Sequence, residues 1–175
     1  MYLGDGSISN TNPTPVISLS LNEDKYIHSI DIIRKALENL RINADITLNS
    51  VYNNVYPVRI GSGKLEKFIR AYVKGSYSYE KELDMNCLLQ SREFRQGILD
   101  GYYITDGGNS NRIYTTSQKL SECIECLLTS LGLQSVIDVV DRTNEPVIIR
   151  GEEFNRNYPT ICIRWYEPKN KRSRN

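Results

Sequence analysis

The chain has 175 residues, which suits one large domain or two small fused ones, and its formal net charge at pH 7 is only +1. Hydrophobic residues make up 39% and charged residues 25%, as in a globular protein with a real core. A net charge of +1 excludes a uniformly basic surface. No apolar run reaches the roughly 20 residues of a membrane span. We therefore expect an intracellular protein in which any nucleic-acid surface comes from local clusters of basic residues.

The cysteines and the single histidine do not suggest a site. Four cysteines are too few and too scattered for a disulfide framework. Cys123 and Cys126 form a CxxC pair, but the pair lies inside an amphipathic helical pattern, so both are expected to be buried apolar residues. His28 lies within a predicted helix that continues well past it, which argues against a catalytic histidine.

The first part of the chain reads as a helix end followed by alternating strands and helices. After Asp5-Gly6, the apolar residues Ile17, Leu19 and Leu21 alternate with polar ones, which predicts the second strand of a hairpin. The helical spacing of apolar residues, among them Ile27 and Leu40, predicts a helix over 24–42. This unit is completed by two strands around Asn53-Asn54 within 44–63, a short helix over 64–75 and a connector over 76–90.

The second unit starts with a helix that has clear start and stop signals, residues 91–108. Ser91 is a good N-cap, and Gly107 and Gly108 are expected to end the helix in the left-handed conformation that glycine tolerates. This helix is followed by a strand over 109–117, a helix over 118–133 and strands over 134–140 and 158–166. A polar segment separates the last two strands, and a basic tail ends the sequence.

The last turn of this helix repeats the start of the chain. The segment 103–108 matches 2–7 position for position, so Gly4 aligns with Thr105 and Asp5 with Asp106. Gly97, Gly101 and Thr105 lie four residues apart and form a small-residue stripe, which lets a second helix approach closely. Two such helices side by side would bring Asp5 and Asp106 together, and a divalent metal would offset their repulsion. The alternative is that each Asp-Gly pair is only a helix end.

The repeat predicts the fold class, an α+β protein of two pseudo-symmetric αββαββα-like units that are joined through their first helices. The first unit is residues 1–80, and the second is residues 81–175 with the basic tail. Relative to the first unit, the second loses about ten residues before its second helix and gains about eleven after it, in predicted hairpins where such changes are tolerated. The two sheets side by side would form a long concave surface whose polar strand faces suit a DNA groove.

These residues resemble the LAGLIDADG homing endonucleases, in particular the two-motif kind found inside inteins. The second motif carries the family's pattern in register: Ser91, Glu93, Arg95, Leu99, Gly101, Asp106 and Gly107. The first motif begins at about its middle, because Met1 falls there. No intein splicing residues are found, so the chain is expected to be an endonuclease insert or a free-standing relative.

The resemblance implies a site-specific endonuclease that cuts both strands of double-stranded DNA at a long target and leaves short 3′ overhangs. Asp5 and Asp106 would hold Mg²⁺, and Lys81 is the nearest match to a lysine that acts beside the metal. The fold would work as a monomer with an internal pseudo-dimer. Thr105 departs from the family, which has alanine or glycine at the tightest helix contact.

DNA contacts are expected mostly from arginines on or beside the predicted strands, namely Arg59, Arg112, Arg142 and Arg164. The alternative for each is an exposed arginine in a salt bridge. At the level of the whole protein, two alternatives stay open: a catalytically degenerate, maturase-like DNA- or RNA-binding protein, and a structural domain whose Asp-Gly pairs are only helix ends.

Overall fold

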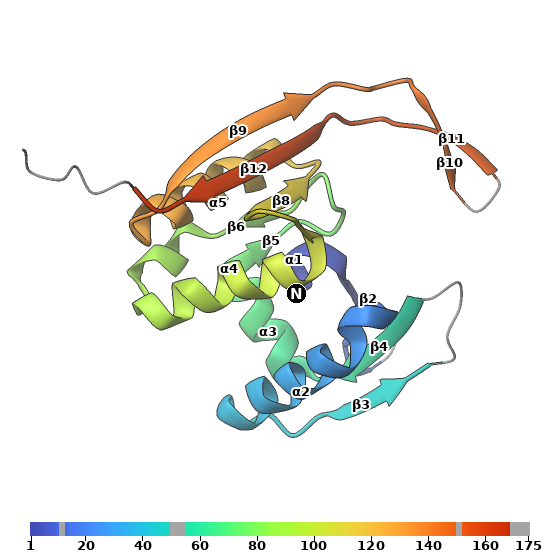
Figure 1. Ribbon diagram of the computed structural model, residues 1–175. Coiled ribbons are helices and arrows are strands. Elements are labelled where there is room, and N and C mark those ends of the chain that lie inside the picture. The colour runs from blue at the N-terminus through green and yellow to red at the C-terminus, as the bar shows by residue number, and fades with distance from the viewer. Residues whose placement is uncertain (11–12, 50–54, 150–151, 169–175) are drawn as a thin grey trace, which may run out of the picture.

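The computed structural model describes residues 1–10, 13–49, 55–149 and 152–168 (Figure 1). It contains two four-stranded antiparallel sheets, each with helices packed on one face, which confirms the α+β class. No helix in these ranges is both long and apolar enough to span a membrane. The predicted turn at Asn53-Asn54 and most of the basic tail lie outside the described residues.

The first unit has the predicted order of elements, and its four strands are arranged β1-β2-β4-β3. Every neighbouring pair is antiparallel. The elements are α1 (Tyr2–Asp5), β1 (Gly6–Ser9), β2 (Val16–Asn22), α2 (Glu23–Asn39), β3 (Asp45–Leu48), β4 (Val55–Gly61) and α3 (Gly63–Tyr72).

The second unit repeats this arrangement with the strand order β7-β8-β12-β9, which confirms the pseudo-symmetry. A two-stranded ribbon and a 3₁₀ helix precede it: β5 (Val73–Lys74), β6 (Glu82–Leu83) and η1 (Met85–Leu89). The unit itself comprises α4 (Arg92–Asp106), β7 (Gly107–Gly108), β8 (Arg112–Thr115), α5 (Gln118–Ser130), β9 (Gln134–Val140) and β12 (Thr160–Tyr166).

The two units differ at the connection between their last two strands. A hairpin of β10 (Pro146–Ile149) and β11 (Glu152–Asn155) is inserted between β9 and β12, where the repeat arithmetic places the extra residues. In Figure 1 this hairpin extends away from the sheet. Within the described ranges no helix follows β12, so the described part of the second unit has the order αββαββ.

Each sheet has one apolar face and one polar face. The predicted alternation in β2 is confirmed, because Ile17, Leu19 and Leu21 are buried. Between them Ser18 pairs with Arg59 of β4, and Arg59 pairs with Thr47 of β3, so these polar residues line up across the opposite face. Side chains alternate between the two faces of a strand, so burying the apolar set leaves the polar set on the open face.

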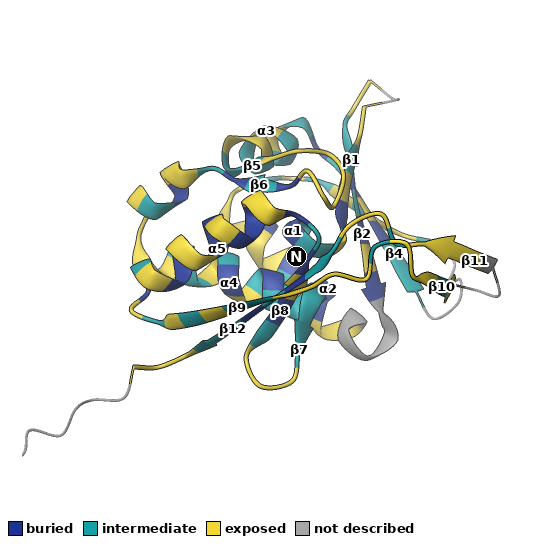
Figure 2. Ribbon diagram, turned by 90° about the horizontal axis from the view of Figure 1, so that it is seen from above, coloured by how far each residue is buried: buried dark blue, intermediate teal, exposed yellow. Residues whose placement is uncertain are grey.

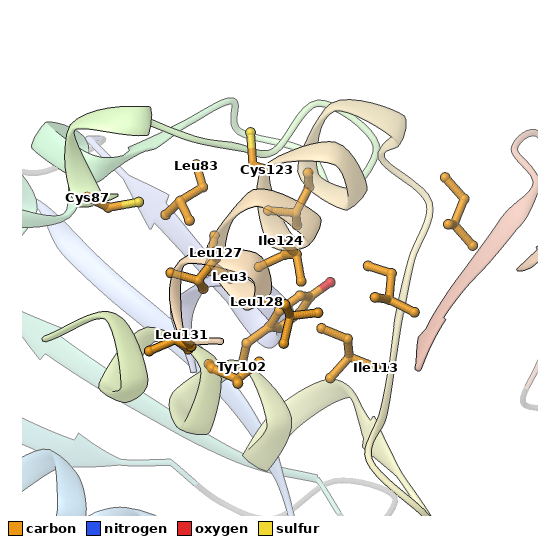
Figure 3. Packing of buried hydrophobic residues seen from close by; sticks show 14 residues of the cluster. Leu3, Leu83, Cys87, Tyr102, Ile113, Cys123, Ile124, Leu127, Leu128 and Leu131 are labelled. Atoms are coloured by element: carbon orange, nitrogen blue, oxygen red, sulfur yellow. The ribbon is translucent and has the colours of Figure 1, made fainter. Parts of the chain in front are cut away.

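The helices cover the apolar faces and create two cores (Figure 2). The core of the second unit lies between α4, α5 and the sheet, and Leu99 and Tyr102 of α4 are 2% and 1% exposed there. Figure 3 shows that Leu3 of the first unit belongs to this same core, so the two units are packed together at α1.

Three sequence-based expectations about helices are wrong. Gly107 is extended (φ −74°, ψ 140°) rather than left-handed, because it starts β7 directly. The helix predicted over 24–42 ends at Asn39, so Leu40 lies beyond α2; within α2, Ile27 is 76% exposed, whereas Ile30 and Leu37 are buried as apolar helix positions. The helix predicted over 64–75 ends at Tyr72, because Val73 and Lys74 pair with β6. In the CxxC pair, Cys123 is buried but Cys126 is exposed.

Candidate functional site

The C-terminal ends of α1 and α4 pack against each other at Gly4. A Cβ atom built on Gly4 would stand 2.1 Å from Asp106 Oδ2 and 2.2 Å from Thr105 Oγ1, so only glycine allows this approach. The small-residue contact predicted from the repeat is therefore present, with Gly4 making room for Thr105. As a result Asp5, the last residue of α1, and Asp106, the last residue of α4, lie at the same helix junction.

The two aspartates have matching surroundings on the C-terminal side. The backbone N–H of Gly6 donates to Tyr2 O, and the N–H of Gly107 donates to Tyr103 O. A Cβ on Gly6 would lie 2.6 Å from Tyr2 O, and one on Gly107 would lie 2.0 Å from Tyr103 O. Glycine is needed here for close approach rather than for a left-handed turn. In each unit the backbone passes from helix to strand directly after the aspartate. Asp5 is exposed and Asp106 is half-buried.

Lys81 is buried beneath the end of α1, with 2% of its surface exposed. Its Nζ atom donates to four backbone carbonyl oxygens, those of Tyr2 at 2.9 Å, Leu3 at 2.9 Å, Gly4 at 2.7 Å and Gly6 at 2.9 Å. An ammonium group has three N–H donors, so one is shared. The last carbonyls of a helix lack partners within the helix, and a cation stabilises that end. Lys81 therefore fixes the backbone on both sides of Asp5.

The chain around Lys81 is held by both units. Gly75, at φ +81°, closes the loop before Lys81, because a Cβ there would lie 2.2 Å from Glu80 O. The Ser117 hydroxyl donates to Lys81 O at 2.7 Å and also accepts from Leu120 N at the start of α5. Lys81 thus joins the N-terminus of α5 to the C-terminus of α1.

Burial lowers the pKa of Lys81 to about 8, while Asp106 and Asp5 act in the opposite direction. Burial also raises the pKa of Tyr102, whose hydroxyl donates to Tyr114 O at 2.9 Å. At neutral pH Lys81 is therefore a charged donor to the carbonyls around it. Because both carboxylates act on the Lys81 charge, the three groups form one electrostatic cluster.

The donor chemistry of the junction fits a hard divalent cation. Asp5 and Asp106 supply carboxylate oxygens, which Mg²⁺ prefers, and Mg²⁺ is commonly held by one or two carboxylates with water and phosphate completing its shell. In the described part of the chain, no group of three or more His, Cys, Asp or Glu side chains forms a metal cluster. A metal at this junction would thus take its remaining ligands from water or a bound phosphate.

The four candidate arginines have different positions. Arg59 is exposed on the open face of the first sheet. Arg112 and Arg164 are cross-strand partners on the corresponding face of the second sheet, and Arg164 Nη2 contacts Asp138 Oδ2 at 2.5 Å. Arg142 lies in the connection after β9, where its Nε is 3.9 Å from Glu145 Oε2. Arg164 and Arg142 therefore have the ion pairs that the alternative reading expected.

Several residues that hold the site in place were not predicted from the sequence. Ser117 is detectable as an N-cap, but its bond to Lys81 joins distant parts of the chain and has no local signal. Tyr79 stacks on Tyr77 and on Tyr158, with ring centroids 5.6 Å and 4.3 Å apart. This stack joins the loop before Lys81 to the segment before β12, and spacing alone did not indicate it.

The fold is similar to that of solved LAGLIDADG homing endonucleases. Solved structures of the homing endonuclease I-DmoI are similar to this chain. A structure of its mesophilic variants has a TM-score of 0.64 at 16% identity over 94% of this chain and 83% of that one. I-DmoI with DNA and calcium gives a TM-score of 0.65 at 16% identity over 94% and 78%, respectively. I-DmoI with DNA and manganese gives 0.63 at 16% identity over 94% and 84%.

At this identity the likeness concerns the fold. No family model matches the sequence, and no curated protein matches it.

Proposed function

We propose that this protein is a site-specific endonuclease that cuts both strands of double-stranded DNA at a long target with Mg²⁺. The observation that carries the proposal is the junction at Gly4, which brings the last residues of two helices, Asp5 and Asp106, to one place. Structural neighbours with this fold are complexes with DNA that contain calcium or manganese, which supports a divalent metal and a DNA substrate.

In this proposal Asp5 and Asp106 are the catalytic carboxylates, and both hold the metal. Bound there, Mg²⁺ would supply a Lewis acid and an acidified water. Hydrolysis adds water to phosphorus, breaks the bond to the leaving oxygen and returns a proton to that oxygen. Asp5 and Asp106 would hold the cation that faces the scissile phosphates, and the close helix contact would keep the two carboxylates at a constant separation.

We assign Lys81 a positioning role in this site. Its ammonium group holds the carbonyls of Gly4 and Gly6, which flank Asp5. It also offsets part of the repulsion between the two carboxylates, since both act on its charge. A lysine that contacted the attacking water directly would need an N–H not already donated to the backbone.

The open faces of the two sheets would bind the DNA. Arg59, Arg112 and Arg164 lie on these faces and would contact phosphates, and Arg142 would contact them from the connection beside the second sheet. Each unit would serve half of the target, so a single chain would suffice as a monomer with an internal pseudo-dimer. The division into residues 1–80 and 81–175 belongs to this proposal.

A second candidate is a catalytically degenerate, maturase-like protein that binds DNA or RNA without cutting it. The four backbone carbonyls around Lys81 Nζ favour it, because they leave this lysine no N–H to donate to an attacking water. Both carboxylates are nevertheless present at the junction, which favours cleavage.

The test is to select bound duplexes from a randomised DNA library and then incubate them with Mg²⁺ or with a chelator. We expect double-strand cuts in Mg²⁺ only, lost in Asp5→Asn and in Asp106→Asn while binding persists. Selected duplexes that stay intact with the wild-type protein would support the second candidate. Failure to select any duplex would contradict the endonuclease and leave only the RNA-binding form of the second candidate.

A further inference from the structure

The hairpin of β10 and β11 is attached to the second sheet by a narrow neck. The pairing of β12 with β9 ends at Thr160, and cross-strand hydrogen bonding resumes where Asn144 N donates to Arg156 O at 2.8 Å. The neck between these points consists of residues 141–143 and 157–159. The direction in which the hairpin leaves the sheet therefore depends on what holds this neck.

A column of three tyrosine rings, Tyr158, Tyr79 and Tyr77, holds the neck against the loop that precedes Lys81. Tyr158, in the neck, stacks on Tyr79 with ring planes 12° from parallel. Tyr79 in turn stacks on Tyr77 with ring planes 1° from parallel. Stacked aromatic rings attract each other beyond the area that they bury. This tyrosine column therefore binds the neck of the hairpin to the loop between β5 and β6.

The far end of the tyrosine column is tied to the backbone of Lys81. Tyr77 O accepts hydrogen bonds from Glu80 N at 2.9 Å and from Lys81 N at 3.1 Å. Lys81 Nζ in turn donates to carbonyls of α1 and to Gly6 O. The carbonyls that Lys81 holds lie on both sides of Asp5. A continuous series of contacts thus runs from the hairpin neck to the first carboxylate.

The two helix ends of the site are supported differently. In the first unit the Gly6 amide donates to Tyr2 O, and Tyr2 O also accepts from Lys81 Nζ. In the second unit the equivalent Gly107 amide donates to Tyr103 O, which belongs to the same helix end. The tyrosine column therefore acts on the first helix end through Lys81, and the Gly107 amide serves as an internal reference.

We propose that Tyr79 and Tyr158 are positioning residues for Asp5. The tyrosine column fixes the backbone of Lys81, and Lys81 fixes the helix end that presents the carboxylate. The base of a hairpin in the second unit thereby holds the first carboxylate in place. The effect on backbone order is independent of any activity, whereas the effect on cleavage rests on the proposed function.

Native-state hydrogen exchange of Tyr158→Ala tests the positioning role without DNA. We expect protection of the Gly6 and Lys81 amides to fall by about tenfold or more, because the links that hold them open locally, while protection of the Gly107 amide stays unchanged. Tyr158→Phe keeps the stacked ring and is expected to retain the wild-type protection. Equal losses at Gly6 and Gly107, or no loss at Gly6, would overturn the proposal.

Tyr166→Ala is the matched control for this experiment. Tyr166 is 47% exposed and lies at the other end of β12, whereas Tyr158 is 41% exposed and lies in the neck. Loss of an exposed tyrosine ring at that distant position is expected to leave the Gly6 amide protected. A Tyr166→Ala protein that loses as much Gly6 protection as Tyr158→Ala would also overturn the proposal.

Single-turnover cleavage of a selected duplex tests the part that rests on the proposed function. At saturating duplex, Tyr158→Ala is expected to cut about tenfold or more slowly with an unchanged Kd, because Asp5 is displaced, and Tyr158→Phe to restore the rate. If the wild-type protein cuts no duplex while the exchange result holds, the proposed function fails and the positioning of Asp5 stands. A loss confined to Kd, with an unchanged rate at saturation, would overturn the role in cleavage.

Discussion

The backbone of Gly4 lies directly against the carboxylate of Asp106, so close that a Cβ on Gly4 would stand 2.1 Å from Asp106 Oδ2. This contact sets the distance between the ends of α1 and α4, and with it the separation of the two carboxylates. The geometry of the proposed site therefore depends on a residue that has no side chain.

Gly4→Ala is expected to push the two helix ends apart. Overpacking of this kind costs typically 1–3 kcal/mol, and a displacement near 1 Å at the site would reduce cleavage by roughly a hundredfold. Urea unfolding and single-turnover cleavage measure the two effects. Gly97→Ala is the matched control on α4, because its Cβ has nothing within 4 Å and alanine favours a helix. Equal activity of the two variants would show that the contact is not needed.

Lys81→Met is expected to destabilise the junction by about 1–3 kcal/mol at neutral pH, because the carbonyls around Nζ lose their buried donor. Lys74→Met is the control, since Lys74 is exposed and its Nζ lies 3.0 Å from Asp84 Oδ2, an ion pair worth at most about 1 kcal/mol. Chemical denaturation of both variants measures the difference. A Lys81→Met protein as stable as Lys74→Met would rule out the positioning role.

The stability that depends on Lys81 should rise with pH in the alkaline range. The pKa of Lys81 is about 8 when folded, against an ordinary value of 10.5, so between these values the unfolded chain keeps a proton that the folded one has lost. The free energy of unfolding therefore increases with pH across this window, by on the order of 3 kcal/mol in total. The measurement is the difference in unfolding free energy between wild type and Lys81→Met, followed from neutral pH to about pH 10. A constant or falling difference would mean that Lys81 is not buried as described.

Arg59→Ala should weaken DNA binding without changing the fold, because Arg59 lies on the open face of the first sheet. If Arg59 contacts one phosphate, the Arg59→Ala variant has a slope of log K against log salt concentration that is less steep than the wild-type slope by about 1. Arg34→Ala is the control: Arg34 is also exposed but lies on α2, which packs on the opposite face of the sheet, and it pairs with Asp31 at 3.5 Å. Equal salt slopes for the two variants would place the DNA elsewhere.

Local signals in the sequence predicted most of the fold. Ser91 does cap α4 by accepting from Phe94 N, and the alternation in β2 does bury Ile17 and Leu19. The repeat of Gly4-Asp5 at Thr105-Asp106 indicated the helix junction, because two matching helix ends with small residues imply close packing. Periodicity and capping are properties of neighbouring residues, so a sequence shows them directly.

The parts that were not predicted depend on distant contacts. Nothing near Lys81 in the sequence shows that its amine would reach the carbonyls of α1, or that Ser117 would hold its backbone. The left-handed ending expected at Gly107 was wrong because β7 begins there and pairs with β8. The stacking of Tyr79 on Tyr158 also has no local signal, since the two rings lie far apart in the sequence.

The central claim is that Asp5 and Asp106 act as one site, and a double-mutant cycle of Mg²⁺-dependent cleavage tests it most directly. Cleavage rates are compared for wild type, Asp5→Asn, Asp106→Asn and the double variant on a selected duplex. Residues that act as a unit show strongly non-additive losses, so each single variant is predicted to lose about as much activity as the double variant. Losses that add, or a single variant that cuts at the wild-type rate, would contradict a shared metal site at the helix junction.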